Sequence, residues 1–186
     1  MAQLPATLDQ IQQAVQRSRR FKYLFFWGHK PRSYGQVDRA CLSQWYTAPF
    51  SVDGHRYPTA EHFMMAEKAR LFGDEDMRQR IITATHPGAA KKLGRQVRGF
   101  KDATWQRARF DIVVLGNRAK FEQNEALGEF LRRTNRRVLV EASPRDRIWG
   151  IGLTADDPRA ANPLSWRGAN LLGFALMEAR SALLGD

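Results

Sequence analysis

A helix that starts directly after Pro58 constrains this chain more than any other segment. Residues 57–69 read YPTAEHFMMAEKA, in which the proline ends the preceding strand or turn and Thr59 stands where a helix N-cap is needed. Glu61 lies in the first turn of the predicted helix, and Lys68 follows about two turns later. Both side chains therefore leave the helix from nearly the same face, where they either pair with each other or act on a ligand.

Length and cysteine content limit the class of protein. The 186 residues, of which 43% are hydrophobic, suit one domain with a sizeable core. The single cysteine, Cys41, excludes an intrachain disulfide and a cysteine metal cluster, and it fits a reducing compartment. No apolar run approaches the roughly 20 residues of a membrane span, and the start of the chain lacks a signal-peptide pattern. We therefore expect a cytoplasmic protein with no membrane association.

The charge balance is strongly basic. The chain has 30 Lys and Arg residues against 19 Asp and Glu residues, a formal net charge of +11. Such a surface attracts polyanions and phosphorylated small molecules, although a generally basic, solvated surface would have the same composition. The basic residues are spread along the whole chain, so no dedicated nucleic-acid-binding arm is indicated.

Hydrophobic periodicity and cap signals predict a mostly helical α+β domain with a few short strands. Strands are expected at 22–27 and 137–142, and Asp53-Gly54 predicts a hairpin turn. Residues 1–20 are expected to form an N-terminal helical extension to a domain covering residues 21–186. Helices are predicted at residues 7–20, 59–72, 74–84, 87–94, 102–123, 125–133 and 168–184.

Five ordered blocks resemble the NADAR, or YbiA-like, family. Besides residues 57–69, they are LSQWY, AKKLGR, LVEASPRDRIWGIGL and WRGANLLGFALMEAR, at residues 42–46, 90–95, 139–153 and 166–180. The first of these differs from the family's Leu-Ser-Asn-Phe-Tyr by Gln44 and Trp45. Each block is weak alone, but the ordered set, which runs from about residue 25 to 180, is specific.

The resemblance implies an N-glycosidase. Its substrate would be a phosphorylated ribose or ADP-ribose joined to an exocyclic amine, either in ADP-ribosylated guanine or in a ribosylamine phosphate intermediate of riboflavin synthesis. ADP-ribosylated nucleic acid is then an expected partner. The family's fold agrees with the α+β prediction, and no cofactor is implied.

Glu61 and Lys68 each have two interpretations. A glutamate in a first turn favours the helix dipole, but the resemblance puts Glu61 at the family's proposed catalytic position. A helical lysine usually extends along the surface to solvent, whereas Lys68, among apolar neighbours, could lose its proton and act as an amine nucleophile. In one route Lys68 attacks a ring-opened imine. In the other, the sugar is hydrolysed directly with a carboxylate as acid or base.

The block at 139–153 supplies further candidates. Asp146 is a candidate catalytic residue that would bind ribose hydroxyls or position the sugar, and Trp149 offers a stacking face beside Gly150, where backbone can approach a ligand. The alternative is a buried tryptophan that anchors a turn, with Asp146 paired to Arg145 or Arg147.

Candidate ligand contacts come from three other blocks as well. Gly94 and Arg95 match the family block, and guanidinium groups such as those of Arg95 and Arg147 bind phosphate oxygens well. Asn170 either caps the last helix or contacts the ligand, and Gln44 is included with the ligand-binding residues. We expect no metal, because the four histidines show no paired ligand spacing.

Two other classes of protein remain open. A non-catalytic module that binds ADP-ribose or an NAD-like ligand would use the same site without turnover, although such a binder gains little from a carboxylate at Glu61. A basic nucleic-acid-binding domain would show salt-dependent affinity for unmodified DNA.

Overall fold

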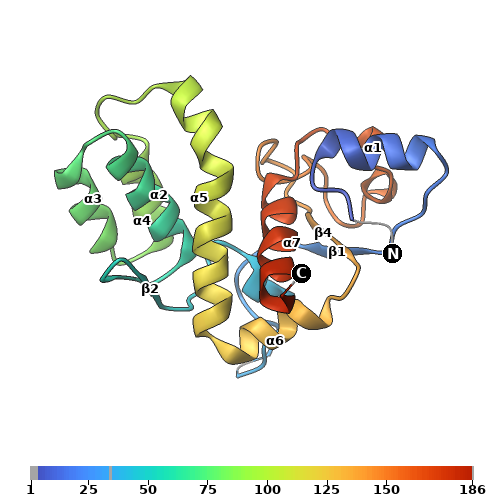
Figure 1. The fold of residues 1–186 in the computed structure, drawn as a ribbon, viewed down its shortest axis with the longest axis horizontal. Helices are drawn as coiled ribbons and strands as arrows, with labels where there is room; N and C mark the ends of the chain where they lie inside the picture. Colours follow the sequence, from blue (N-terminus) through green and yellow to red (C-terminus); the bar gives the residue numbers. More distant parts are fainter. Residues whose placement is uncertain (1–3, 34, 186) are drawn as a thin grey trace.

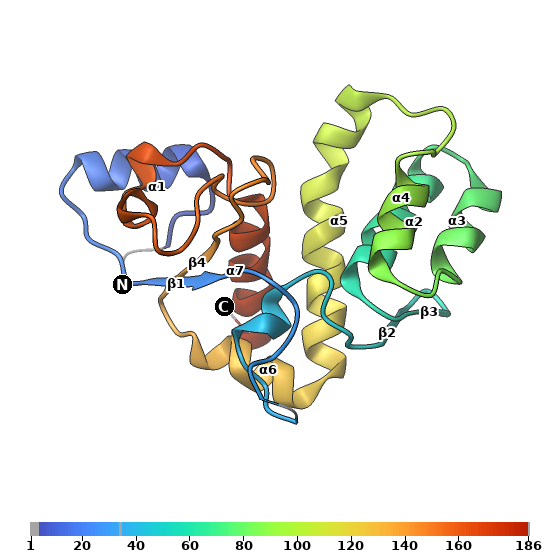
Figure 2. The same cartoon turned by 180° about the vertical axis from the view of Figure 1, so that it is seen from behind.

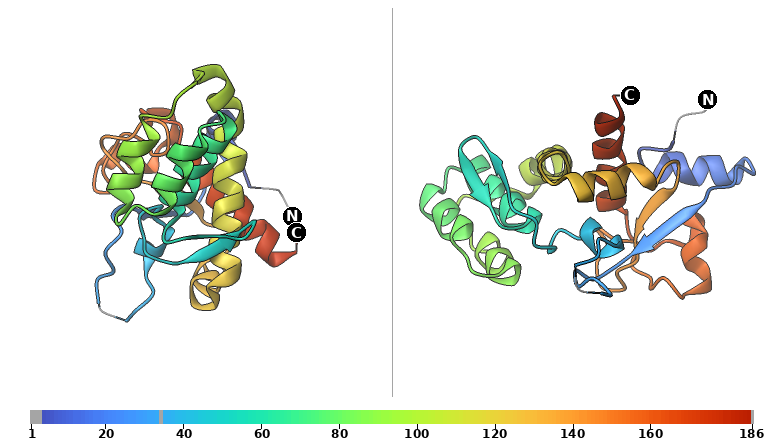
Figure 3. Two further views of the ribbon diagram at one scale, coloured as in Figure 1. Left: turned by 90° about the vertical axis from the view of Figure 1, so that its left-hand side faces the viewer. Right: turned by 90° about the horizontal axis from the view of Figure 1, so that it is seen from below.

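The longest helix, α5 (Asp102–Gln123), divides the elements of this chain into two groups (Figure 1). The computed structural model describes residues 4–33 and 35–185. On one side of α5, α2 (Ala60–Leu71) packs against α3 (Glu75–Ile82) and α4 (Pro87–Gly94). On the other side, α7 (Leu171–Leu184) packs along α5 and contacts strand β4. The two groups lie at opposite ends of the molecule when it is seen from below (Figure 3).

The second group is built on a pair of parallel strands, β1 (Tyr23–Phe26) and β4 (Val138–Glu141). Tyr23 pairs with Val138 at one end, and Phe26 pairs with Glu141 at the other. Main-chain bonds extend the pair at both ends, from Val138 N to Lys22 O and from Ala142 N to Phe26 O. The carboxyl ends of both strands therefore meet at Glu141, which begins the long loop leading to α7.

A tight hairpin connects this region to α2. Strands β2 (Phe50–Val52) and β3 (His55–Tyr57) pair antiparallel, as the Asp53-Gly54 signal predicted. Asp53 has φ 48° and Gly54 has φ 76°, so both turn residues adopt the left-handed conformation that this type of hairpin requires. The turn brings Tyr57 into the core directly before α2 begins.

Local caps explain where several helices start. Thr7 accepts from Gln10 N before α1 (Leu8–Gln16), Thr59 accepts from His62 N before α2, and Asp74 accepts from Met77 N before α3. Helix α6 (Glu125–Arg133) follows α5 directly. Short 3-10 turns complete the fold, namely η1 (Arg39–Leu42), η2 (Pro158–Ala161) and η3 (Pro163–Ser165). The view from behind shows η1 between the two groups (Figure 2).

Two predicted boundaries are wrong. Helix α1 ends at Gln16 rather than near residue 20, because Ser18 takes a left-handed conformation with φ 61°. Helix α7 begins at Leu171 rather than at residue 168, because Asn170 is also left-handed, with φ 53°. Neither residue is a glycine, so the sequence carries no strong signal for these breaks.

One continuous core runs under both groups, so the chain forms a single α+β domain, as predicted. Phe50, Tyr57 and Phe63 form a buried aromatic cluster against α5. Gly116 of α5 allows this approach, because a Cβ there would lie 2.5 Å from the ring of Phe63. Ile11 of α1 is fully buried, so the N-terminal helix packs onto the rest of the chain. Among the described helices, none is both long and apolar enough to cross a bilayer.

Candidate active site

Glu61 is buried at the start of α2, with 2% of its surface exposed. The Thr59 cap fixes the first turn, and Glu61 N donates to the main-chain oxygen of Gln44 at 2.9 Å. The carboxyl oxygen Oε1 has no hydrogen-bond partner among the described residues. The sequence placed Glu61 in a first helical turn, and the structure turns its carboxyl inward rather than to solvent.

The surroundings of Glu61 favour its neutral form. The pKa of the carboxyl is raised to about 7, chiefly by burial and to a smaller extent by the charge of Asp146. Lys91 and Arg95 of the α4 region lower the pKa, and so does a hydrogen bond with the Trp45 side chain. A carboxyl with a pKa near neutrality can donate a proton in one step and accept it in another.

The carboxyl of Glu141 is a second buried acid, and it shares its charged neighbours with Glu61. Glu141 is the last residue of β4, and its Oε2 is buried without a hydrogen-bond partner in the described chain. Its pKa is raised to about 8, chiefly by burial; the charges of Asp146 and Glu61 contribute to this rise, and that of Lys91 opposes it. Glu141 is not among the site residues predicted from the sequence. Its position at the carboxyl end of a buried parallel strand, where ligands commonly bind in α/β sheets, was the available signal.

Asp146 and Trp149 belong to one tight loop after β4. Asp146 Oδ1 accepts from Ile148 N at 2.9 Å and from Trp149 N at 2.8 Å, which fixes the path of the loop. The charge of Asp146 acts on both Glu61 and Glu141, so the structure brings these three carboxyl groups together. Trp149 is half-buried against the core, and its backbone oxygen accepts from Leu172 N of α7.

The positive charges of the site come from α4. Lys91 lies in α4, and Arg95 is the C-cap residue of this helix. The positive charges of both side chains lower the pKa of Glu61. Lys91 Nζ also lies 6.0 Å from the ring centre of Trp45, which contacts His86, the N-cap residue of α4. The cluster thus joins α2 and α4 on one side of the fold to β4 and its loop on the other.

Lys68 lies at the far end of this arrangement. Its Nζ donates to Gly94 O at 2.8 Å and lies 4.2 Å from the centre of the Phe100 ring. Burial lowers its pKa. Lys68 is not among the charges that act on Glu61, but Gly94 directly precedes Arg95, which does act on Glu61. Of the two interpretations of these residues, direct pairing of Glu61 with Lys68 is not seen, and Lys68 adjoins the cluster through the end of α4.

Both predicted glycines have packing roles. A Cβ on Gly94 would lie 2.2 Å from the Met65 sulfur, so this glycine lets α4 approach α2. A Cβ on Gly150 would lie 2.8 Å from the backbone oxygen of Glu141, so this glycine lets the Asp146 loop close onto the end of β4. Each glycine sets the distance between groups of the cluster.

Two residues predicted as ligand contacts, Asn170 and Gln44, are buried and bonded to other groups of the protein. Asn170 is fully buried, its Oδ1 accepts from Glu141 N at 3.0 Å, and its Nδ2 donates to Leu139 O at 3.0 Å. It makes no side-chain cap for α7. Gln44 is 7% exposed, and its Nε2 donates to Asn117 Oδ1 at 3.1 Å. Asn170 therefore positions Glu141, and Gln44 positions Glu61 through its backbone.

Arg147 remains available as a ligand contact. Its side chain is exposed in the loop after β4, while its backbone oxygen accepts from Ala169 N. In the described chain, no group of three His, Cys, Asp or Glu residues is placed to hold a metal ion.

A fully buried lysine supports the segment that carries Gln44 and Trp45. Lys120 of α5 donates to the backbone oxygens of Cys41 at 2.7 Å and Ser43 at 2.9 Å. Burial lowers its pKa to about 8. This lysine anchors the chain just before the residues that contact Glu61.

Comparisons with known proteins agree with this arrangement. The family model described as NADAR domain matches residues 25–184. The chain is 42% identical over 164 residues to an N-glycosidase of Acanthamoeba polyphaga mimivirus, covering 86% of this chain and 95% of that protein. It is 32% identical over 146 residues to N-glycosidase YbiA of Escherichia coli, covering 78% and 82% of the two chains.

A solved structure and a longer plant protein are also similar. The NMR structure of the Escherichia coli protein YbiA matches with a TM-score of 0.71 and 28% identity, and the match covers 97% of this chain and 94% of that one. A riboflavin biosynthesis protein of Zea mays is 32% identical over 140 residues, which are 72% of this chain and 21% of that protein.

Proposed function

This chain belongs to the NADAR domain family and is a hydrolase of N-glycosyl bonds, and from that premise we propose that it releases a phosphorylated ribose or ADP-ribose from an exocyclic amine. ADP-ribosylated guanine and a ribosylamine phosphate intermediate of riboflavin synthesis both contain this bond. The similarity to the plant riboflavin protein supports the second substrate, and the +11 charge of the chain suits phosphate in either.

The observation that carries the proposal is the coupled pair of buried carboxyls. The pKa of Glu61 is raised to about 7 and that of Glu141 to about 8, and Asp146 acts on both. Two desolvated carboxyls beside the charge of Asp146 cannot both ionise easily, so at least one proton stays on the Glu61–Glu141 pair near neutral pH. A purely structural site would gain nothing from such an arrangement.

We assign the proton transfer to Glu61. Its carboxyl gives a proton to the exocyclic nitrogen as the bond between that nitrogen and C1′ of the ribose breaks. The electron pair of the bond leaves with the amine, and the sugar becomes cationic at C1′. The negative charge of Asp146 stabilises that cation, and water adds to C1′ while its proton returns to the cluster.

Lys68 offers a second route to the same products. If the ribosylamine opens to an imine, a neutral Lys68 amine adds to C1′, the exocyclic amine leaves with the proton from Glu61, and water then hydrolyses the lysine imine. The pKa of Lys68 is lowered by burial, which favours the neutral amine this route needs. Glu61 acts as proton donor in both routes.

The cations and aromatic rings around the acids suit the rest of the substrate. Arg95 and the exposed Arg147 are suited to phosphate oxygens, because guanidinium groups bind them with two parallel hydrogen bonds. Lys91 adds a point charge beside Glu61. Trp149 is half-exposed beside Asp146, where its indole can stack on the base or the sugar.

We also expect the enzyme to work in the cytoplasm, where both substrate types would be met. Cys41, the only cysteine of the chain, is buried as a free thiol. A cysteine that stays a free thiol is expected in a reducing compartment such as the cytoplasm.

The test is direct incubation with three substrates. ADP-ribosylated guanine is supplied as a free nucleotide and within DNA, the ribosylamine phosphate is supplied separately, and products are read by mass spectrometry. We expect release of the free sugar phosphate or ADP-ribose from at least one of them. Tight binding of ADP-ribose with no cleavage of any of the three would identify a non-catalytic binding module instead.

A further inference from the structure

A basic cavity of about 430 Å³ lies at the end of the strand pair away from the acids. Two separate segments form its walls, one before β1 and one between α6 and β4. Among the described residues that line it, none is acidic and five are cationic. The lining residues are Leu4, Arg19, Arg20, Phe21, Lys22, Asn135, Arg136 and Arg137.

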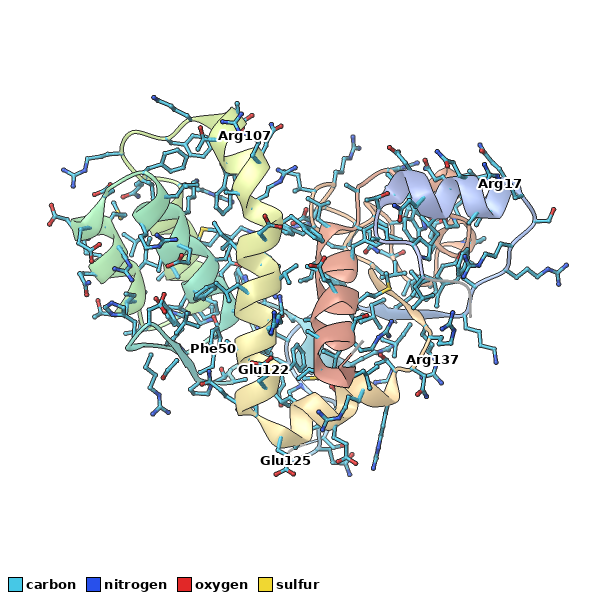
Figure 4. All side chains as sticks on the ribbon, viewed as in Figure 1. Arg17, Phe50, Arg107, Glu122, Glu125 and Arg137 are labelled. Carbon is cyan, nitrogen blue, oxygen red and sulfur yellow. The ribbon has the colours of Figure 1, made fainter. Side chains whose placement is uncertain are left out.

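The parallel strands bring the two walls together. Val138 N donates to Lys22 O at 2.9 Å, so Lys22 stands opposite the start of β4 and next to Arg137. The side chains of Arg20, Lys22 and Arg137 are exposed. Figure 4 shows Arg137 pointing outward from this end of the molecule. The fold thus gathers cations that lie more than a hundred residues apart in the sequence.

A buried arginine adds positive charge beneath the cavity. Arg180 of α7 is 2% exposed and donates from Nη1 to Thr134 Oγ1 at 2.6 Å and to Arg137 O at 3.0 Å, both of which are neutral acceptors. Its pKa is lowered to about 10, by burial and by the charge of Arg136. Because both of these acceptors are neutral, the buried guanidinium adds to the positive potential of this surface.

The cavity is separate from the acidic cluster. Lys22 precedes β1 and Phe26 ends it beside Glu141, so the two sites lie about 13 Å apart at 3.3 Å per strand residue. Five lining cations exceed what one phosphate group needs and are spread over two chain segments. Cations that come from separate walls of one cavity suit successive phosphates along a strand better than a single anion.

We propose that this cavity binds the phosphodiester backbone of a nucleic-acid strand. The contacts would be to phosphates and would not depend on base sequence. This site goes beyond the proposed glycosidase activity, because it takes an unmodified strand and uses none of the acidic residues. Its test therefore needs no turnover, and its result does not depend on which N-glycosyl bond is cleaved.

The experiment measures binding of an unmodified, fluorescein-labelled single-stranded DNA of about 16 nucleotides by fluorescence anisotropy. It compares the wild-type protein with Arg20→Gln/Lys22→Gln/Arg137→Gln between about 50 and 200 mM salt. We expect the triple variant to bind on the order of tenfold more weakly at the lowest salt. The slope of log K against log salt should become shallower by about 2, since each lost phosphate contact in a single strand contributes about 0.7.

A charge-matched control is Arg56→Gln/Arg80→Gln/Arg107→Gln. These three arginines are exposed in β3, α3 and α5, on the other side of the molecule from Arg137 (Figure 4 labels Arg107). The control should bind DNA within a few-fold of the wild type and keep its salt slope. Equal loss in both triple variants, or no loss in either, would overturn the proposal. So would pyrophosphate that binds as tightly as the strand, because it would identify a site for a small anion.

Discussion

Glu61 and Glu141 share one electrostatic environment, although they reach it from opposite sides of α5. The charge of Lys91 lowers the pKa of both carboxyls, that of Asp146 raises both, and Glu61 itself raises the pKa of Glu141. Neither Glu61 Oε1 nor Glu141 Oε2 has a hydrogen-bond partner among the described residues. Buried carboxyl oxygens without hydrogen-bond partners are unfavourable for folding, which points to selection for chemistry at this place.

The first prediction concerns the pH dependence of the reaction. Because the pKa of Glu61 is raised to about 7, the proton donor is present below that pH and lost above it. We expect kcat/KM to fall about tenfold per pH unit above this value. Asp146→Asn keeps an oxygen acceptor for Ile148 N and Trp149 N but removes the charge that raises the pKa of Glu61. When kcat/KM is plotted against pH, the decline on the alkaline side should therefore begin at a lower pH in this variant. A decline that begins at the same pH, or at a higher one, would contradict the coupling of Asp146 to Glu61.

The second prediction concerns Asn170, which combines a left-handed backbone with two buried hydrogen bonds to β4. Asn170→Gly keeps the backbone conformation and loses both bonds. We expect the free energy of unfolding to fall by about 1–3 kcal/mol for a buried group left unpaired, measured by urea denaturation.

Asn170→Ala should lower the free energy of unfolding by about 1–2 kcal/mol more than Asn170→Gly, because alanine has a Cβ that disfavours the left-handed conformation. Both variants should also lower kcat, because Glu141 N loses its anchor. An alanine variant as stable as the glycine variant would show that backbone conformation at residue 170 carries no cost.

The third prediction separates the two chemical routes through Lys68. If the lysine route operates, borohydride added during turnover should trap a sugar adduct on Lys68, and Lys68→Arg should abolish turnover. Arginine keeps the positive charge near Gly94 O and Phe100 but cannot form the imine. Mass spectrometry of the trapped peptide is the measurement. If Lys68→Arg stays active and no adduct forms, the amine is no nucleophile and direct hydrolysis accounts for the reaction.

The fourth prediction uses the buried Lys120. Its pKa falls from 10.5 in a free side chain to about 8 in the folded protein, so between these values the unfolded chain binds more protons than the folded one. The free energy of unfolding should therefore gain a few kcal/mol from this residue as pH rises through that window. Lys120→Met removes the titrating group, so the difference in stability between wild type and variant should increase over the same window. A constant difference would show that Lys120 titrates normally.

Much of the fold could be predicted because its signals are local. Thr59 and Asp74 act on backbone groups within three residues, and Asp53-Gly54 fits a hairpin whatever surrounds it. The bounds of α4 and α5 followed from proline, glycine and apolar periodicity in the same way. The early end of α1 and the late start of α7 could not be predicted, since both depend on left-handed residues that are not glycine.

The site was harder to predict, because its geometry depends on contacts between distant segments. Glu61 and Asp146 were found from the family blocks, but Glu141 reads in sequence as the end of an ordinary buried strand. Its burial depends on the loop that Gly150 brings close and on its bond with Asn170. Asn170 and Gln44 were predicted as ligand contacts, whereas only the structure shows that Asn170 binds the backbone of Glu141 and Gln44 that of Glu61.

The most direct test of the account is the turnover of Glu61→Gln. Because the pKa of Glu61 is about 7, the wild-type carboxyl is mostly neutral below neutral pH. There, an amide of the same shape should preserve the fold and leave ADP-ribose affinity unchanged. Glu67→Gln is the matched control, because Glu67 lies in the same helix and is buried but pairs with Arg70 away from the cluster.

We predict that Glu61→Gln cleaves substrate about a hundred- to ten-thousand-fold more slowly than wild type, while Glu67→Gln stays within a few-fold of it. The measurement is the single-turnover rate of sugar release, with ligand affinity and thermal unfolding recorded on the same samples. A folded Glu61→Gln protein that binds ADP-ribose and cleaves at the wild-type rate would contradict the assignment of Glu61 as the proton donor.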